Sequence, residues 1–219
     1  MMGIVLLGPP GVGKGTQAKR LQEALGLLHL STGEVLRQEV SAGTALGKRV
    51  SGVMASGALV ADELVGEVVE TALEKGLPPS SGYLLDGFPR TLRQVEILDS
   101  LLRRARRGLD HAVLIDAAEP LLVRRLTGRR VCDRCGALYH TDGKPPSSPG
   151  ICDACGGVLV QRKDDHENVV TERLRVYREQ TSPVLEAYGG RGLLRRIDGS
   201  GSSDEVFALI ISAIGGVRV

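Results

Sequence analysis

The sequence of 219 residues predicts an α/β fold built around a parallel sheet. Short apolar runs recur along the chain, and they lack the polar–apolar alternation of a strand with one face in water. A longer segment of helical character follows each run. Strands that alternate with helices form parallel sheets covered by helices on both faces. We therefore expect a three-layer core with a five-stranded parallel sheet.

The elements follow in order from these patterns. The strands are expected at residues 3–7, 28–30, 83–86, 112–116 and 193–197. Helices are expected at residues 14–25, 32–40, 63–74, 91–107, 119–127, 169–180 and 204–214. Ser31 and Thr32 suit a helix cap, and Pro120 suits a first helical turn. Residues 51–61 form a stretch of small residues without a predicted helix, and Pro183 is expected to interrupt the helix before it.

Composition excludes several classes of protein. With 42% hydrophobic and 25% charged residues, the chain is neither disordered nor collagen-like. No apolar run reaches the roughly 18 residues that span a bilayer, and the N-terminal residues do not resemble a signal peptide, so we expect a cytoplasmic protein. A net charge of +2 and few aromatic residues argue against a protein that coats nucleic acid.

Arginine dominates the basic residues, with 22 Arg against six Lys. A genome rich in G and C would produce the same bias. Arginine is also the side chain that binds phosphate in a bidentate manner. Both explanations stay open at this point.

A glycine-rich loop directly follows the first strand. Residues 8–14, GPPGVGK, fit the pattern G-x-x-x-x-G-K between a strand and a helix, the context that a phosphate-binding loop requires. Most such loops continue with a Ser or Thr that holds magnesium, but this chain has Gly15 there. Either Thr16, one position later, takes that role, or Asp86 holds the ion through water.

Two C-x-x-C-G segments, at residues 132–136 and 152–156, contain all four cysteines of the chain. Their spacing is typical of a four-cysteine zinc ribbon. Disulfides are the main alternative, but they are rare in cytosolic proteins. Four thiolates close the coordination shell, so the ion would be structural. We expect an inserted module that depends on zinc for its folding, with ligands Cys132, Cys135, Cys152 and Cys155.

The glycine-rich loop and its continuation, GPPGVGKGTQ at residues 8–17, resemble the form found in adenylate kinases. Four further regions agree in order: STGEVLR at 31–37, GALV at 57–60 before the acidic pair 62–63, DGFPRT at 86–91 with Gln94 downstream, and the pair GRRV at 128–131 and RKDD at 162–165. The resemblance spans essentially the whole chain. It identifies the chain as a member of the nucleoside monophosphate kinase family, in the long-lid form with a four-cysteine zinc site.

This resemblance implies the reaction ATP + AMP ⇌ 2 ADP with magnesium, on a P-loop kinase core. The single domain, residues 1–219, would comprise a core at 1–30, 61–127 and 166–219, a helical AMP-binding insert at 31–60 and a zinc-containing lid at 128–165. It would act as a monomer on ATP, AMP and ADP, with no nucleic acid or membrane partner.

The resemblance also implies a role for particular residues. The catalytic cations would be Lys14, Arg90, Arg129, Arg162 and Arg173. ATP would contact Gly11, Val12, Gly13, Lys14, Gly15, Thr16, Arg129, Leu138, Tyr139 and Gly201. AMP would contact Thr32, Arg37, Ala58, Leu59, Val60, Gly87, Phe88, Pro89, Arg90, Gln94, Arg162 and Arg173. Asp86 would hold magnesium through water.

Simpler interpretations apply to some of these residues. Asp86 could cap the next turn and have no other role, and Gln94 could be an exposed helical residue. Ala58 stands where many relatives carry Lys, so it would contact AMP only through its backbone or methyl group. The arginines at 103, 104, 106 and 107 match no motif and are expected at the surface, as are Arg124 and Arg130.

Three other functions fit the sequence less well. A GTP- or ATP-driven switch is disfavoured because the chain has no Asn-Lys-x-Asp motif. A zinc-ribbon nucleic-acid module is disfavoured because the ribbon is inserted within a kinase frame. A UMP/CMP kinase usually has a short lid without zinc, so it is the second choice.

Overall fold

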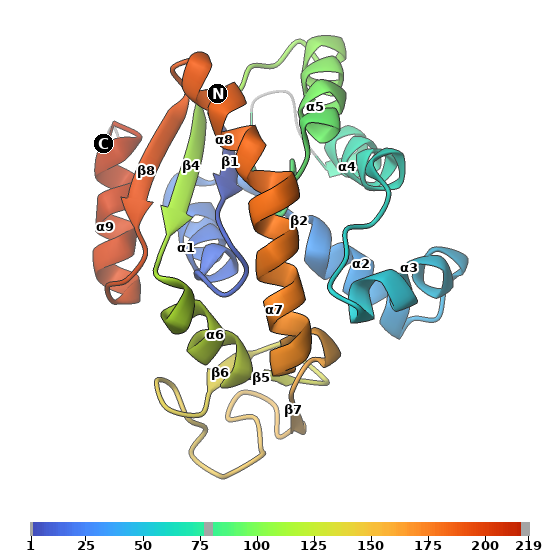
Figure 1. Cartoon of the computed structure of the whole chain (residues 1–219), viewed down its shortest axis with the longest axis vertical. Coiled ribbons are helices and arrows are strands. Elements are labelled where there is room, and N and C mark those ends of the chain that lie inside the picture. Colours follow the sequence, from blue (N-terminus) through green and yellow to red (C-terminus); the bar gives the residue numbers. More distant parts are fainter. Residues whose placement is uncertain (1, 77–80, 216–219) are drawn as a thin grey trace.

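The structure is a computed structural model, and it describes residues 2–76 and 81–215. Its centre is a five-stranded parallel sheet in the order β2-β3-β1-β4-β8 (Figure 1). The strands are β1 (Gly3–Leu7), β2 (Leu28–Ser31), β3 (Tyr83–Asp86), β4 (His111–Asp116) and β8 (Leu194–Asp198). All five strands that the sequence predicts are therefore confirmed, within a residue or two at their ends.

Strand β1 shows why the apolar runs do not alternate. All five of its residues are buried, since both faces of the sheet are covered. Ile4 and Leu6 face one core cluster, with α1 (Lys14–Leu25) and α9 (Ser203–Ala213). Val5 and Leu7 face the other, with α4 (Asp62–Gly76), α5 (Leu92–Arg104) and α8 (Ser182–Gly190). The expected three-layer core is confirmed.

Two helices fill the segment between β2 and α4. Helix α2 (Thr32–Ser41) begins where the Ser31 side chain accepts a hydrogen bond from the Glu34 amide, at 3.4 Å. Helix α3 (Ala45–Ala55) was not predicted, because its glycines give it low helical propensity. Packing overrides that propensity: a Cβ at Gly47 would lie 2.1 Å from the Glu39 carbonyl oxygen, so glycine permits a close approach to α2.

The chain from 128 to 165 forms a small separate sheet at one end of the core (Figure 1). Its antiparallel strands are β5 (Arg129–Cys132), β6 (Leu138–His140) and β7 (Leu159–Val160), in the order β6-β5-β7. Helix α6 (Glu119–Thr127) leads into it, and a 3₁₀ turn, Lys163–Asp165, leads out. We call residues 128–165 the lid segment.

The helix after the lid segment does not stop at Pro183, contrary to the sequence prediction. Helix α7 (Glu167–Val176) passes through a π-helical turn, Tyr177–Thr181, directly into α8. Pro183 lies in the first turn of α8, where the wide turn has already interrupted the regular hydrogen-bond ladder.

A second boundary also differs from the prediction. Helix α5 ends at Arg104 rather than near 107, because Arg106 adopts a left-handed backbone conformation with φ of 52°. Among the described residues, no helix is both long and apolar enough to span a membrane.

Candidate active site

The glycine-rich loop joins β1 to α1 at the carboxyl end of the sheet. Gly13 caps α1 in the left-handed conformation, with φ of 102°. Gly8 approaches β4 so closely that a Cβ there would lie 2.1 Å from the Ile115 carbonyl oxygen. The Val12 side chain is buried in the core. These contacts fix the loop to the core, as a phosphate-binding loop requires.

Lys14 folds back over this loop. Its Nζ donates hydrogen bonds to the Gly8 carbonyl at 2.7 Å and the Pro9 carbonyl at 2.9 Å. The pKa of Lys14 is lowered to about 7, chiefly by burial; the neighbouring arginines contribute to this lowering and Asp86 opposes it. A phosphate group beside such a lysine would stabilise its charged form.

A cavity of about 450 Å³ opens above the loop, between the sheet and the lid segment. Ligands of open α/β sheets bind at this edge. The sequence-predicted ATP residues all line it: Gly11, Val12, Gly13, Lys14, Gly15, Thr16, Arg129, Leu138, Tyr139 and Gly201. The walls therefore come from the core and from the lid segment together.

A smaller cavity of about 70 Å³ adjoins the first. Its lining includes Thr32, Arg37, Ala58, Leu59, Val60, Gly87, Arg90, Gln94 and Arg173, all predicted as AMP contacts. Pro89 and Arg162 line the larger cavity, whereas the Phe88 side chain is fully buried in the core and lines neither. Arg37, Arg90 and Arg173 line both cavities, so three cations stand where the two meet.

The segment after β3 is held by a chain of hydrogen bonds. Arg90 Nε donates to the Gly87 carbonyl at 2.8 Å, and the Arg90 amide donates to Gln94 Oε1 at 2.7 Å. Gln94 Nε2 in turn donates to Asp62 Oδ1 at 2.9 Å. The Gln94 side chain is buried and lines the smaller cavity, so it is not an exposed helical residue. Thr32 Oγ1 donates to the Gly87 carbonyl at 3.0 Å.

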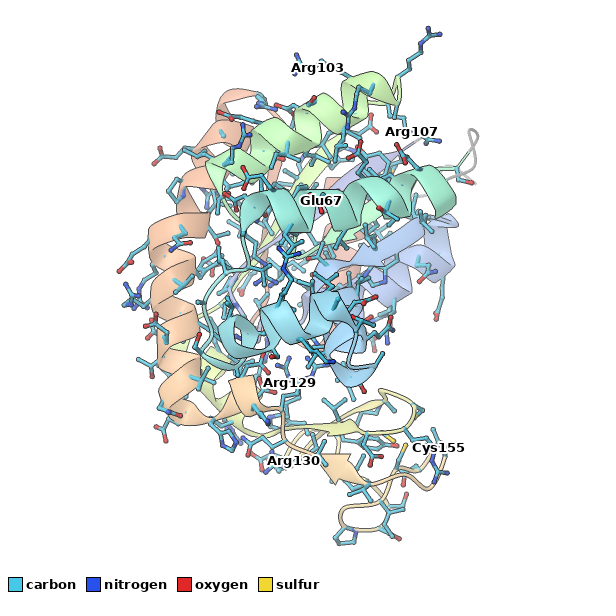
Figure 2. All side chains as sticks on the ribbon, turned by 90° about the vertical axis from the view of Figure 1, so that its right-hand side faces the viewer. Glu67, Arg103, Arg107, Arg129, Arg130 and Cys155 are labelled. Carbon is cyan, nitrogen blue, oxygen red and sulfur yellow. The ribbon has the colours of Figure 1, made fainter. Side chains whose placement is uncertain are left out.

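Two aspartates hold the arginines at the base of the lid segment. Asp165, fully buried, accepts hydrogen bonds from Arg129 Nε at 2.7 Å and Nη2 at 2.5 Å. It also accepts one from Arg173 at 3.0 Å, and Asp164 forms a 3.1 Å ion pair with Arg173. Figure 2 shows Arg129 at the junction between the lid segment and the rest of the molecule. These ion pairs orient both guanidinium groups.

The cations crowd one another. The pKa values of Arg90 and of Arg162 are lowered to about 10, chiefly by burial and in part by neighbouring arginines. The pKa of Arg37 is lowered for the same reasons. Among residues 2–76 and 81–215, the guanidinium groups of Arg37 and Arg162 have no hydrogen-bond or ion-pair partner. An arrangement of this kind favours a polyanionic ligand.

Asp86 lies at the carboxyl end of β3, buried and lining the larger cavity. Its Oδ2 is 3.6 Å from where a Cβ on Gly15 would stand, so the carboxylate lies beside the first turn of α1. Thr16 lines the same cavity and is exposed. Carboxylate and hydroxyl oxygens are donors that suit a magnesium ion, so both candidate positions fit one.

The four cysteines of the lid segment converge. All four Sγ atoms lie within 4.8 Å of one another, with the Cys132–Cys155 pair at 3.4 Å and the Cys135–Cys152 pair at 3.6 Å. A disulfide needs about 2.05 Å, whereas sulfurs around a tetrahedral zinc ion lie about 3.8 Å apart. The Cys135 amide donates to Cys132 Sγ and lowers the pKa of that thiol. These thiols fit a metal ion.

Four of the six arginines expected at the surface are exposed, namely Arg103, Arg104, Arg106 and Arg124, whereas Arg107 and Arg130 are half-buried. Arg124 pairs with Asp142 at an exposed site, and Arg130 donates only to the backbone. Figure 2 shows Arg103 and Arg107 at the end of the molecule opposite Arg129. His140, beside the first cysteine segment, lies within 3.2 Å of the Arg124 carbonyl through Nε2 and is not part of the cysteine cluster.

Sequence reasoning missed several side chains that line the larger cavity. The clearest is Arg125, which donates to the Gly199 carbonyl at 2.8 Å, in the loop that also contains Gly201. The Gly-Ser-rich loop after the last strand was an available signal, because loops at the carboxyl ends of parallel strands bind ligands. Further examples are Gln17, Lys144, Tyr177, Thr181 and Ser203.

Comparison with known proteins agrees with this geometry. The sequence model of the family described as adenylate kinase matches residues 6–193. An adenylate kinase from Clostridium tetani is 46% identical over 217 residues, which cover 99% of this chain and 100% of the relative. Adenylate kinases from Thermotoga neapolitana (97% of this chain, 96% of the relative) and Moorella thermoacetica (98% of each) are both 47% identical. With the phosphate loop, the adjoining cavities and these full-length matches in agreement, the chain belongs to the adenylate kinase family.

Proposed function

We propose that this protein transfers the terminal phosphoryl group of ATP to AMP, reversibly, giving two ADP. One observation carries the proposal: half-buried cations surround the point where two cavities of unequal size adjoin. The larger cavity, beside the phosphate loop, suits a triphosphate. The smaller suits a monophosphate held by Arg37 and Arg90.

The residues would act by position and charge. The attacking group is an AMP phosphate oxygen, already ionised at neutral pH, so no general base is needed. Lys14 would bind the β- and γ-phosphates of ATP, and Arg37 and Arg90 the phosphate of AMP. Arg129, Arg162 and Arg173 would surround the group in transit. Charge develops on the oxygens of that group, and preorganised cations stabilise it most in the transition state.

Magnesium would accompany ATP, and Asp86 is the residue that we propose to hold it through water. When bound, the ion neutralises phosphate charge. The burial of Asp86 beside the phosphate loop supports this choice over the turn-cap interpretation. Thr16 remains the alternative oxygen donor on the loop itself.

We further propose that residues 31–60 close over AMP and that the lid segment closes over ATP. Water would compete with AMP as an acceptor in an open site, so closure would prevent hydrolysis of ATP and complete the ring of arginines. The division of the cavity walls between the core, the lid segment and α2 supports this. The acidic pair Asp164 and Asp165 stands where the lid segment rejoins the core.

The four lid cysteines would hold one structural zinc ion. The lid segment has few buried residues to stabilise it, and a closed four-thiolate site would provide that stability without catalytic chemistry. The unbridged thiols suit a cytoplasmic protein. Because one chain contributes every residue of the proposed site, we propose that the monomer is active.

A coupled assay with ATP and a panel of acceptors tests the function. We expect a clear preference for AMP over GMP, CMP and UMP. A preference for UMP or CMP would instead favour the related pyrimidine kinases and would overturn the assignment. Metal analysis of the purified protein should find about one zinc ion per chain.

A further inference from the structure

Tyr139 connects the cysteine cluster to the wall of the larger cavity. Its side chain is buried with Cys132 and Cys152 in the small core of the lid segment, and it also lines the larger cavity. Its hydroxyl lies 3.6 Å from Cys152 Sγ and accepts a 2.8 Å hydrogen bond from the Asp153 amide. One side chain therefore belongs to both sites.

The direction of the hydrogen bond to sulfur follows from chemistry. A cysteine that binds a metal ion is a thiolate, which can only accept. The Asp153 amide already occupies an acceptor position of the Tyr139 oxygen, so the hydroxyl hydrogen is free to point at Cys152. Partners of this kind orient a ligand and strengthen metal binding.

The side chain that makes this contact belongs to strand β6. Tyr139 is the central residue of β6, and the residues on either side of it, Leu138 and His140, also line the larger cavity. His140 and Lys144 exchange backbone hydrogen bonds of 3.0 and 3.3 Å, and Lys144 Nζ lies 5.8 Å from the centre of the Tyr139 ring. An anchored tyrosine thus holds the turn from 138 to 144 against the cavity.

We propose that Tyr139 is a positioning residue that couples metal retention in the lid segment to ATP affinity. The inference rests on the proposed function, since it requires a metal in the cysteine cluster and ATP in the larger cavity. It predicts that loss of one hydroxyl disturbs both sites, while the AMP side, built from α2, α3 and the Gly87–Gln94 region, is unaffected.

The test is Tyr139→Phe, with Tyr188→Phe as the matched control. Tyr188 is buried in the core, and among the described residues its hydroxyl has no hydrogen-bond partner. Zinc-loaded proteins are mixed with a chromophoric chelator, and zinc release is followed by absorbance. We expect Tyr139→Phe to release zinc roughly ten times faster than wild type or more, and Tyr188→Phe to match wild type. The KM for ATP should rise about fivefold in Tyr139→Phe, with the KM for AMP unchanged.

Release at the wild-type rate in Tyr139→Phe would overturn the inference, as would equal acceleration in both variants. Faster release with an unchanged KM for ATP would overturn the coupling. An unchanged KM for AMP shows that the variant is folded. Wild-type protein without metal would instead refute the proposed zinc site, and that result is obtained without any variant.

Discussion

The phosphate loop and the lid segment bring cations to the same cavity, but different forces hold them. The loop extends from β1, whose residues are all buried, and its Val12 side chain is part of a large core cluster. By contrast, among the described residues the apolar cluster of the lid segment has only three buried members, Cys132, Tyr139 and Cys152. Apolar burial therefore fixes Lys14 before any ligand arrives, whereas Arg129 is held by ion pairs, in a segment that we propose a metal ion stabilises. Mobile catalytic parts commonly come from such weakly stabilised regions.

Lys14→Met tests the rigid side of this comparison and should have the largest effect. A hydrogen bond to a charged group contributes about 1.5–3 kcal/mol, and a contact that strengthens in the transition state contributes more. We expect kcat/KM to fall at least about a hundredfold in a coupled assay, with an unchanged circular dichroism spectrum. Arg90→Ala should behave alike.

The matched control is Lys19→Met, which removes an exposed lysine from the same helix. It should retain wild-type turnover. Near-normal rates in Lys14→Met would show that the loop holds no phosphate in the transition state.

Removal of the proposed zinc ion tests the lid segment. With a chelator present, we expect amides of residues 131–160 to lose protection from hydrogen exchange, while amides of β1 and β4 keep theirs. With magnesium kept in excess over the chelator, turnover should fall by about tenfold or more, because the lid arginines lose their support. Restoration of both by added zinc is the control. A simultaneous loss of protection in the lid segment and the core would contradict two independently stabilised regions.

Asp165→Asn disturbs the junction between the two regions. The fully buried carboxylate binds two arginines, so its neutralisation leaves buried charges without compensation. Breaking such a pair costs about 3–5 kcal/mol, which urea unfolding would measure, and turnover should fall about tenfold. Asp142→Asn is the control, because its pair with Arg124 is exposed and should contribute less than about 1 kcal/mol. Equal destabilisation of the two variants would argue against this role for Asp165.

How far the sequence predicts this molecule differs between its parts. The five strands and the loop at 8–14 were predictable, because burial on both faces and glycine spacing are local patterns. The cysteine cluster was predictable for the same reason. Helix α3 was not, since its stability comes from packing on α2 rather than from its own residues. The π-helical turn before Pro183 likewise could not be predicted from local sequence patterns.

The candidate site shows the same limit. Lys14, Arg37 and Arg90 could be proposed because each stands in a recognisable motif. Arg125 stands in none, and its place against the Gly199 carbonyl depends on how α6 packs near the last loop. The contact of Tyr139 with Cys152 joins residues 13 positions apart, and only the folded lid segment brings them together.

The pH dependence of ATP affinity should give the smallest effect. It tests the phosphate loop, because the titrating group is Lys14. Burial holds the pKa of Lys14 near 7 in the free protein, lowered from its ordinary value of 10.5. Phosphate favours the charged amine and raises that pKa, so ATP binding above neutrality takes up a proton. Affinity should therefore fall by a few-fold in all as pH rises from about 7.5 to 9, below the limit of about tenfold per pH unit that uptake of one proton sets. Calorimetry in buffers of different ionisation enthalpy would measure the proton uptake. In Lys14→Arg the side chain stays charged, so its profile should be flat, and an equal slope in both proteins would assign the proton to another group.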